Sequence, residues 1–380
     1  MVSSGSKIFL VAGARPNFMK IAPILSQLRG RTSFRPVVIH TGQHYDNDMS
    51  QAFFRDLELS PPDVNLKVGS GRQAQQTGQI MREFERVVLK APPDLVMVVG
   101  DVNSTVACSL VAAKMHIPVA HVEAGLRSFD RRMPEEINRV LTDAVSNYLF
   151  TTCTDANENL LREGIPSERI FFVGNVMIDS LLKFREKSTG SSIVERLGLR
   201  RRGYGLITLH RPSNVDEVGK LRGILRAMEI IQRHLPIIFP IHPRSRKMLQ
   251  HFKLEGEVAR ISGLRLIDPV GYIDFLRLMD LAQLVFTDSG GIQEETTVLG
   301  IPCLTLRENT ERPITVREGT NLVVGTNPDR IVQETQAILE LPNRRPRRPK
   351  LWDGRAAARI VNVLLKTMHP SKVSKIRRKG

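Results

Sequence analysis

Short, almost wholly apolar runs alternate with amphipathic stretches along most of this 380-residue chain. A strand that is apolar on both faces must be covered on both, and a parallel sheet flanked by helices does this. Helical patterns at 17–29, 75–90 and 135–147 separate several of the runs. The alternation therefore predicts an α/β fold with doubly wound parallel sheets. In the first half the apolar runs are residues 7–13, 35–42, 93–101, 117–125, 147–153 and 169–175.

The alternation stops at FREKSTGSSIVERLGLRRRG, residues 184–203, which is typical of a connector. It then resumes with the apolar runs 204–210, 235–242, 264–270, 282–290 and 301–307. A chain of this length can bury two cores. We therefore predict an N-terminal domain over 1–183, a connector over 184–203 and a second domain over 204–355. Residues 356–380 form a final helix and a basic tail, and the helix could pack back on the first domain.

Composition limits the function classes. The formal net charge is +16, but the basic clusters (200–202, 344–350 and the tail) lack interleaved aromatics and any binding module, so we predict no nucleic-acid partner. The three scattered cysteines form no CxxC, which argues against a disulfide framework or a metal cluster and favours the cytoplasm. No apolar stretch reaches the roughly 18 residues of a membrane span, so no membrane partner is expected.

Polar side chains follow nearly every predicted strand. In open α/β sheets, ligands bind beyond the carboxyl ends of the strands. Acids, bases and histidines at so many exits predict a site for a polar ligand there. The residues are Arg15, Lys20, Gln43, His44, Asp101, His121, Glu123, His210, Arg211, His242, Arg244, Asp288 and Ser289.

The stretch HVEAGLRSFDRRMPEEINR, residues 121–139, concentrates charge after one of these strands. It holds Arg127, Arg131 and Arg132 and, after them, the carboxylate pair Glu135 and Glu136. One interpretation is a solvated loop of mixed charge, with His121 as a satisfied core histidine. The other is a site where arginines position the loop or hold an anion, and where Glu123 and Glu135 move protons. The sequence leaves both open.

The stretch TDSGGIQEE, residues 287–295, indicates a strand end, a small turn and a helix start. Two glycines let a ligand approach the backbone, and a helix N-terminus offers unpaired N–H groups to phosphate. A plain tight turn, with Ser289 capping the helix, is the alternative. VGSGRQA fits a dinucleotide-binding pattern, but no strong strand precedes it, and we reject that interpretation.

Taken together, seven motifs resemble those of the non-hydrolysing UDP-N-acetylglucosamine 2-epimerases. The resemblance runs from about residue 7 to 368 and implies two Rossmann-like domains facing a cleft, the glycosyltransferase-B architecture. In that fold the nucleotide is held mainly by the C-terminal domain. The motifs are GARPNFMKIAP, TGQHYDNDM, VVGDVNST, HVEAGLRSFDRRMPEEINR, LHRPSN, TDSGGIQEE and TERP.

The resemblance also implies roles for individual residues, with no cofactor and no metal. The acid–base group would be Asp101, Glu123 and Glu135, with His210 near the diphosphate. Substrate binding would fall to Arg15, Lys20, Phe275, Ser289, Gly290, Gly291, Glu295 and Arg312. A second UDP-sugar, UDP-GlcNAc, would act as an allosteric activator at Gln43, His44 and Arg72. This chain departs from the family pattern at Ala14 and Asn17, where threonine and glutamate are often found, and at Asp46, where some members have glutamine.

The residues suit C2 epimerisation of a nucleotide sugar on chemical grounds. Expulsion of UDP acidifies C2, a carboxylate removes the proton, and re-addition gives the other epimer. Cations and N–H groups stabilise the leaving diphosphate. We expect UDP-GlcNAc to UDP-ManNAc conversion for surface polysaccharide synthesis, by a homodimer. A diacetamido-sugar or uronate substrate, a glycosyltransferase and a non-catalytic binding protein are the alternatives.

Overall fold

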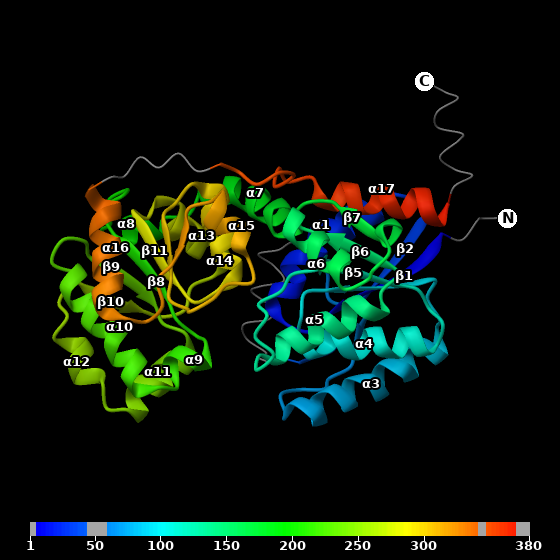
Figure 1. Cartoon of the computed structure of the whole chain (residues 1–380), viewed down its shortest axis with the longest axis horizontal. Coiled ribbons are helices and arrows are strands. Elements are labelled where there is room, and N and C mark those ends of the chain that lie inside the picture. The colour runs from blue at the N-terminus through cyan, green and yellow to red at the C-terminus, as the bar shows by residue number, and fades with distance from the viewer. Residues whose placement is uncertain (1–4, 44–58, 341–346, 370–380) are drawn as a thin grey trace, which may run out of the picture. The chain divides into compact units, whose positions relative to one another are not determined.

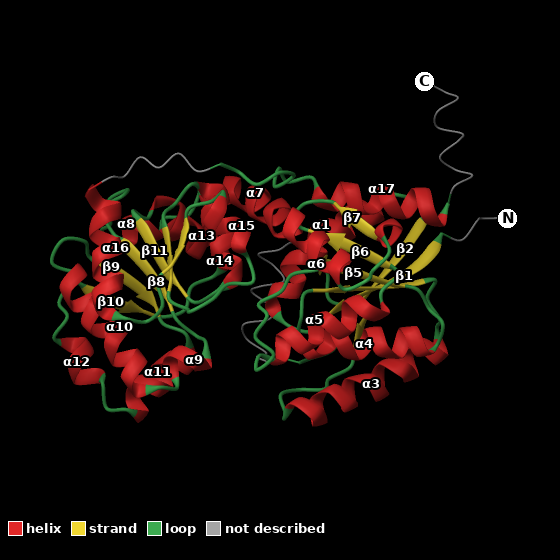
Figure 2. Cartoon of the chain, viewed as in Figure 1, coloured by secondary structure: helices red, strands yellow, loops and turns green. Residues whose placement is uncertain are grey.

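The computed structural model describes residues 5–43, 59–340 and 347–369 and divides the chain into two compact units. Unit 1 comprises residues 1–180 and 350–380, and unit 2 comprises 181–349. Figure 1 shows the course of the chain, and Figure 2 shows helices flanking both sheets. No helix in the described ranges has the length and apolar character needed to cross a membrane.

Unit 1 is built on a seven-stranded parallel sheet of order β3-β2-β1-β4-β5-β6-β7. Its strands are β1 (Ser6–Ala12), β2 (Phe34–His40), β3 (Val64–Asn65), β4 (Leu95–Val99), β5 (Val119–Ala124), β6 (Tyr148–Thr151) and β7 (Ile170–Phe172). Its helices are α1 (Arg15–Arg29), α3 (Gln73–Lys90), α4 (Asn103–Lys114), α5 (Pro134–Val145), α6 (Thr154–Arg162), the 3-10 turn η1 (Ser167–Arg169) and α17 (Ala356–Met368).

Unit 2 has a six-stranded parallel sheet of order β10-β9-β8-β11-β12-β13. Its strands are β8 (Gly205–Thr208), β9 (Ile237–Pro240), β10 (Leu264–Ile267), β11 (Leu284–Thr287), β12 (Cys303–Thr305) and β13 (Asn321–Val323). Its helices are α8 (Ile193–Arg196), α9 (Pro212–Val215), α10 (Val218–Ile231), α11 (Pro243–His251), α12 (Glu255–Ala259), α13 (Tyr272–Leu281), α14 (Gly290–Leu299), α15 (Pro313–Arg317) and α16 (Pro328–Glu340).

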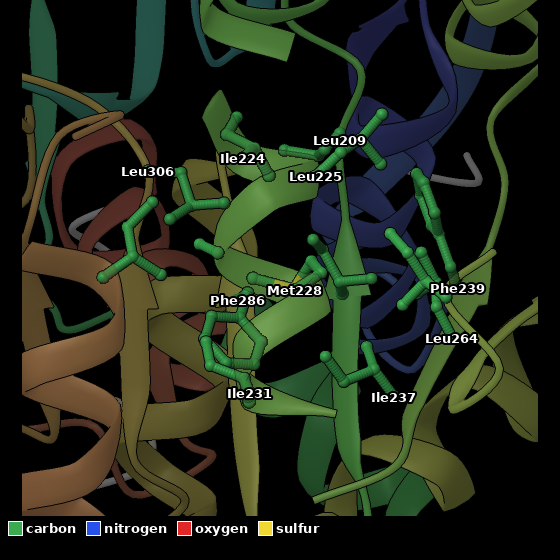
Figure 3. Packing of buried hydrophobic residues seen from close by; sticks show 14 of the residues in the cluster. Leu209, Ile224, Leu225, Met228, Ile231, Ile237, Phe239, Leu264, Phe286 and Leu306 are labelled. Carbon is green, nitrogen blue, oxygen red and sulfur yellow. The ribbon is translucent and has the colours of Figure 1, made fainter. Parts of the chain in front are cut away.

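The core of unit 2 illustrates how the sequence pattern builds each layer. Helix α10 buries Leu221, Ile224, Leu225, Met228 and Ile231, which recur every three or four residues and so share one face. Figure 3 shows this face packed against buried strand residues of the sheet. The predicted pair of parallel α/β sheets is confirmed.

The segment 184–203, predicted as a connector, folds onto unit 2. Helix α7 (Val176–Ser188) contains the point along the chain at which unit 1 ends and unit 2 begins, and α8 packs against α13. Phe184, Ile193 and Val194 are buried, and the ring of Phe184 contacts Tyr272 edge-on at 5.9 Å. These apolar residues, interspersed among charges, anchor the segment and make it part of the packed unit. The final helix, α17, packs against α1 of unit 1.

The strand order determines where polar residues gather. In unit 1 the order reverses between β1 and β4, and in unit 2 it reverses between β8 and β11. The loops that follow these neighbouring strands diverge to opposite faces and leave room for a ligand at the strand ends. Five of the seven motifs singled out in the sequence follow β1, β4 and β5 in unit 1, and β8 and β11 in unit 2, whereas TGQHYDNDM begins after β2 and TERP follows β12.

Candidate functional site

The end of β5 holds Glu123 in an uncommon backbone conformation. Its φ is 75°, in the left-handed region, and the pairing of β5 with β6 shifts register between Val122 and Ala124. A non-glycine residue there costs about 1–3 kcal/mol and persists where its surroundings enforce it. The carboxylate is buried and forms an ion pair with the ammonium of Lys20 on α1. Sites with such local strain are often functional.

The turn after β4 lies against the same ion pair. Gly100 has a φ of 68°, and a Cβ at this position would come 3.0 Å from Lys20 Nζ. The next residue, Asp101, accepts a hydrogen bond from Arg139 Nη2 at 2.5 Å, and Arg139 Nη1 donates to Glu136 at 2.6 Å. The exits of β4 and β5 therefore bring Asp101 and Glu123 into one region of unit 1.

The charged loop between β5 and α5 is held mainly by carboxylates of the neighbouring helices, Glu136 on α5 and Glu163 at the end of α6. Glu136 accepts hydrogen bonds from the backbone of Ser128 and Phe129, both at 2.9 Å. Arg127 is buried and makes a double hydrogen bond to Glu163, at 2.7 and 2.6 Å. Burial alone would lower the pKa of Arg127, but its carboxylate partners raise it. Of the two interpretations left open for the arginines, Arg127 fits the one in which it positions the loop.

His121 is a core histidine with both ring nitrogens engaged. Its Nδ1 lies 2.6 Å from Asp143 Oδ1, and its Nε2 lies 2.9 Å from the Gly100 carbonyl, which can only accept. Asp143 also pairs with Arg127 at 2.8 Å. Burial raises the pKa of Asp143, but His121 and Arg127 outweigh burial and bring it below its usual value.

The loop after β1 carries the residues predicted to hold phosphate. Arg15 is exposed at the first position of α1, whereas Lys20 is buried with its ammonium on Glu123. Asn17 accepts hydrogen bonds from the N–H groups of Gly13 (3.0 Å) and Ala14 (2.9 Å). Its amide also donates to the Val99 carbonyl at 3.1 Å. Asn17 thereby joins the turn after β1 to the end of β4.

The residues predicted to bind an activator are only partly described. Gln43 is buried, and its side-chain oxygen accepts from the N–H (3.2 Å) and hydroxyl (2.8 Å) of Ser104. Arg72 is exposed at the N-cap of α3. His44 and Asp46 lie outside the described residues.

In unit 2, the start of α14 forms the second cluster. Ser289 occupies the N-cap position, but its side chain makes no capping hydrogen bond, which corrects the prediction that it caps the helix. Gly290 lies against the guanidinium of Arg312, since a Cβ there would come 3.3 Å from Arg312 Cζ. Arg312 Nε in turn donates to Glu294 at 2.9 Å. With Gly291, these residues bring N–H groups and a cation to one helix end, a suitable site for phosphate.

His210 and Arg211, after β8, are fixed to the end of β11. The buried carboxylate of Asp288 accepts from the N–H groups of His210 (3.0 Å) and Arg211 (2.9 Å) and from His210 Nδ1 (2.8 Å). Burial opposes ionisation, yet His210 lowers the pKa of Asp288. Arg211 Nε also donates to the Asp288 carbonyl at 3.1 Å. Nearby His242 has its pKa lowered, first by burial and then by His210.

Glu295, predicted to bind ribose, is buried on α14. Its Oε1 accepts a hydrogen bond from Tyr272 of α13 at 2.8 Å, and burial raises its pKa to about 7. Phe275, predicted to lie near uracil, is partly exposed on the same helix as Tyr272. Glu135 is partly exposed in the first turn of α5.

The structure adds residues that motif reasoning gave no role. Arg139 and Asp143 follow Glu135 at intervals of four along α5, so the three share one helix face. That spacing was a usable signal in the sequence. Arg307 and Glu311 offered no such signal: their 2.8 Å ion pair is buried in the β12–α15 loop. In the described ranges no group of three or more His, Cys, Asp or Glu residues is arranged to hold a metal.

Residues 26–365 match the family model described as UDP-N-acetylglucosamine 2-epimerase. The UDP-N-acetylglucosamine 2-epimerase of Methanocaldococcus jannaschii is 44% identical over 363 residues, covering 94% of this chain and 98% of that protein. The UDP-2,3-diacetamido-2,3-dideoxy-D-glucuronate 2-epimerase of Pseudomonas aeruginosa is 42% identical, covering 88% and 92%.

Among solved structures, the Methanocaldococcus jannaschii UDP-GlcNAc 2-epimerase in complex with UDP-GlcNAc and UDP is closely similar. The TM-score is 0.88 at 44% sequence identity, and the match covers 94% of this chain and 99% of that one.

Proposed function

This chain belongs to the UDP-N-acetylglucosamine 2-epimerase family, and we propose that it inverts C2 of UDP-GlcNAc to give UDP-ManNAc, reversibly and without hydrolysing the intermediate. One observation carries the proposal. Unit 1 holds a carboxylate, Glu123, at a strained strand end beside the turn that bears Asp101. The similar enzyme from Methanocaldococcus jannaschii is a UDP-GlcNAc 2-epimerase that has been solved with UDP-GlcNAc and UDP.

The proposed reaction passes through a 2-acetamidoglucal. The bond from C1 to the diphosphate oxygen breaks, and UDP leaves with the electron pair. A carboxylate then takes the C2 proton, and the C1–C2 double bond forms. Return of a proton to the opposite face of C2, with re-addition of UDP at C1, gives the epimer. General acid–base catalysis of this kind contributes about 100- to 10,000-fold in rate.

Unit 1 supplies the acid–base group in this proposal. Glu123 and Glu135 are the candidate proton carriers, and Asp101 either moves a proton or orients the C3 hydroxyl. Lys20 has two possible partners, the Glu123 carboxylate that it contacts and the substrate's phosphates. Its ion pair with Glu123 favours a role in holding that carboxylate, and Arg15, exposed at the start of α1, is then the residue to bind phosphate.

Unit 2 supplies the nucleotide site. The N–H groups at Ser289, Gly290 and Gly291 and the guanidinium of Arg312 would stabilise the leaving diphosphate, with His210 beside them. Each such donor in a site closed to water is worth about 3 kcal/mol. Glu295, fixed by Tyr272, would accept from the ribose hydroxyls, and Phe275 would contact the uracil.

The sugar substituents define the alternative. The Pseudomonas aeruginosa relative is named for a 2,3-diacetamido uronate and is 42% identical, so that substrate class is the second candidate. A glycosyltransferase is a weaker one, because it gives no reason for clustered carboxylates in unit 1. Incubation with UDP-GlcNAc, without an acceptor, nicotinamide or metal, should give UDP-ManNAc by NMR. Turnover of the diacetamido uronate alone would reassign the substrate.

We also propose UDP-GlcNAc as an activator, through Gln43, His44 and Arg72. If so, the reaction started from pure UDP-ManNAc should show a lag that a trace of UDP-GlcNAc removes, because the activator must favour the competent state. Hyperbolic kinetics without a lag would remove this role. The buried bonds of Gln43 to Ser104 favour an action through the β2 exit loop.

Assembly and cellular role complete the proposal. Phe129, Ile137 and Leu141 are exposed on α5 and the loop before it, with Phe129 at 74%, and such a surface supports a homodimer. Sedimentation would test it. A cytoplasmic location and a supply of ManNAc-type sugars to surface polysaccharide remain predictions.

A further inference from the structure

Asp143, one of two buried carboxylates on α5, connects several parts of unit 1. It is fully buried. Its Oδ1 lies 2.6 Å from His121 Nδ1, and its Oδ2 accepts from the N–H of Gly125 at 3.0 Å. Arg127 adds an ion pair at 2.8 Å. A buried charge with this many partners serves a specific arrangement, since any one partner lost would leave a costly unpaired group.

Two of these partners flank Glu123 at equal distance along the chain. His121 lies two residues before it and Gly125 two residues after it. Between them the backbone passes through the β-bulge and the left-handed φ of Glu123. A glutamate keeps that conformation only where the surroundings hold it. Asp143 binds both ends of this segment and so restrains the backbone where the strain lies.

The same carboxylate also reaches the turn before Asp101. His121 Nε2–H donates to the Gly100 carbonyl at 2.9 Å, and the Gly100 N–H donates to Val122 at 3.1 Å. Gly100 is the residue that leaves room for Lys20 beside Glu123. One connected set of hydrogen bonds thus runs from α5 to the β4 and β5 exits.

We propose that Asp143 is a positioning residue that, through His121 and the Gly125 N–H, fixes the backbone of Glu123 and thereby the place of its carboxylate in the epimerisation. The inference rests on the proposed function, because it takes Glu123 to be a proton carrier. Misplacing a catalytic group by about 1 Å can cost on the order of 100-fold in rate.

The test is a double-mutant cycle of Asp143→Asn and Glu123→Gln, with UDP-GlcNAc as substrate. Asparagine keeps the shape of the side chain but replaces one acceptor oxygen by a donor group. We expect kcat to fall roughly 10- to 100-fold, with little change in KM or in the Kd for UDP. In the Glu123→Gln background the same change should cost less than about twofold further, because its effect passes through Glu123.

The matched control is Asp179→Asn, also in unit 1. Asp179 accepts from the N–H groups of Ala356 and Ala357 at 3.1 and 2.8 Å, far along the chain from Glu123. It should change stability while kcat remains at the wild-type level. Should Asp143→Asn fail to fold, His121→Gln removes one of the two anchors and should show a smaller loss with the same lack of additivity.

The outcomes separate the two ideas. Near-normal kcat in Asp143→Asn beside a slow Glu123→Gln would overturn the positioning role alone. Losses that multiply in the double variant would also overturn it, because a merely structural residue acts independently. Near-normal kcat in Glu123→Gln would instead overturn the assignment of Glu123 in the proposed function.

Discussion

Each unit has its own parallel sheet and an Arg-Pro turn after its first strand, but the two units arrange charge in opposite ways. In unit 1, Glu123 and Asp101 lie at the strand exits, each paired with a cation, Lys20 or Arg139. In unit 2, a cation, Arg312, lies at the start of α14, and Glu294 is its carboxylate partner. One fold has thus produced a cluster suited to proton transfer and a cluster suited to an anion.

The difference teaches that the residues behind a site define its chemistry as much as those in it. An isolated buried charge is too costly to keep, so each site needs a counter-ion. In unit 1 the counter-ions are the cations Lys20 and Arg139, and the groups that they hold are carboxylates. In unit 2 the counter-ion is the carboxylate of Glu294, and the group that it holds is the guanidinium of Arg312, beside the N–H groups at the start of α14. Variants that disturb one unit should therefore change one half of the proposed reaction.

The largest expected effect comes from variants that change only the candidate proton carriers of unit 1. Glu123→Gln and Glu135→Gln keep size and hydrogen bonding but cannot accept a proton, so each should lower kcat at least ~100-fold. The Kd for UDP, measured by calorimetry, should stay at the wild-type value because neither glutamate is among the proposed nucleotide-binding residues, which lie in unit 2 except for Arg15. Near-normal rates in both variants, or a parallel loss of UDP binding, would contradict the assignment of proton transfer to unit 1 and of nucleotide binding mainly to unit 2.

The second expected effect concerns unit 2 and is a dependence of the free energy of unfolding on pH. Burial raises the pKa of Glu295 from 4.5 to about 7. The folded state then holds a proton that the unfolded state has lost, so stability should fall as pH rises from about 4.5 to 7 and stay low above. The full difference is roughly 3 kcal/mol. In urea unfolding, Glu295→Gln should reduce the fall in stability by this amount, whereas the exposed Glu229→Gln on α10 should leave it at the wild-type size; an unchanged pH dependence in Glu295→Gln would refute the assignment.

The third effect concerns Asn17, which joins the β1 turn to β4 in unit 1. Asn17→Asp retains the acceptor for Gly13 and Ala14 but places a carboxylate oxygen against the Val99 carbonyl. We expect the free energy of unfolding to drop by about 1–3 kcal/mol. Asn147→Asp is the matched control, since Asn147 accepts from the Val119 N–H at 2.9 Å and an aspartate can do the same. Equal losses in the two variants would show that the Val99 bond contributes nothing.

The smallest effect tests the anion end of unit 2. Gly290→Ala would add a Cβ about 3.3 Å from Arg312 Cζ and displace the guanidinium. Losing part of one charge-assisted contact, about 1.4 kcal/mol, should weaken UDP binding roughly tenfold. Gly219→Ala on α10, where a Cβ meets nothing within 4 Å, should bind UDP like the wild type. Unaltered binding in Gly290→Ala would exclude Arg312 from the nucleotide site.

Much of the fold could be predicted from the sequence, because apolar runs and helical periods are local signals. The two parallel sheets and the strand exits that carry polar residues follow from them. The two-residue β3 was not predicted, since so short an edge strand has no periodicity. The anchoring of 184–203 was missed because Phe184, Ile193 and Val194 stand among charges that suggested a linker.

Only those residues of the candidate site that belong to recognisable motifs could be predicted from the sequence. The residues at strand exits could be collected, but their partners depend on side chains brought together from distant positions. Lys20, assigned to phosphate, lies on Glu123, and Arg127 pairs with Glu163 and Asp143. The left-handed φ of Glu123 has no signature in the sequence, since that region usually selects glycine.

The most direct test of the account follows hydrogen at C2 during turnover in D2O. The wild-type protein is incubated with UDP-GlcNAc, and the C2 position of each epimer is observed by NMR. If a carboxylate of unit 1 removes the C2 proton, all UDP-ManNAc formed must carry deuterium at C2, and recovered UDP-GlcNAc gains it as the reaction reverses. Epimerisation with the C2 hydrogen fully retained would contradict the central claim.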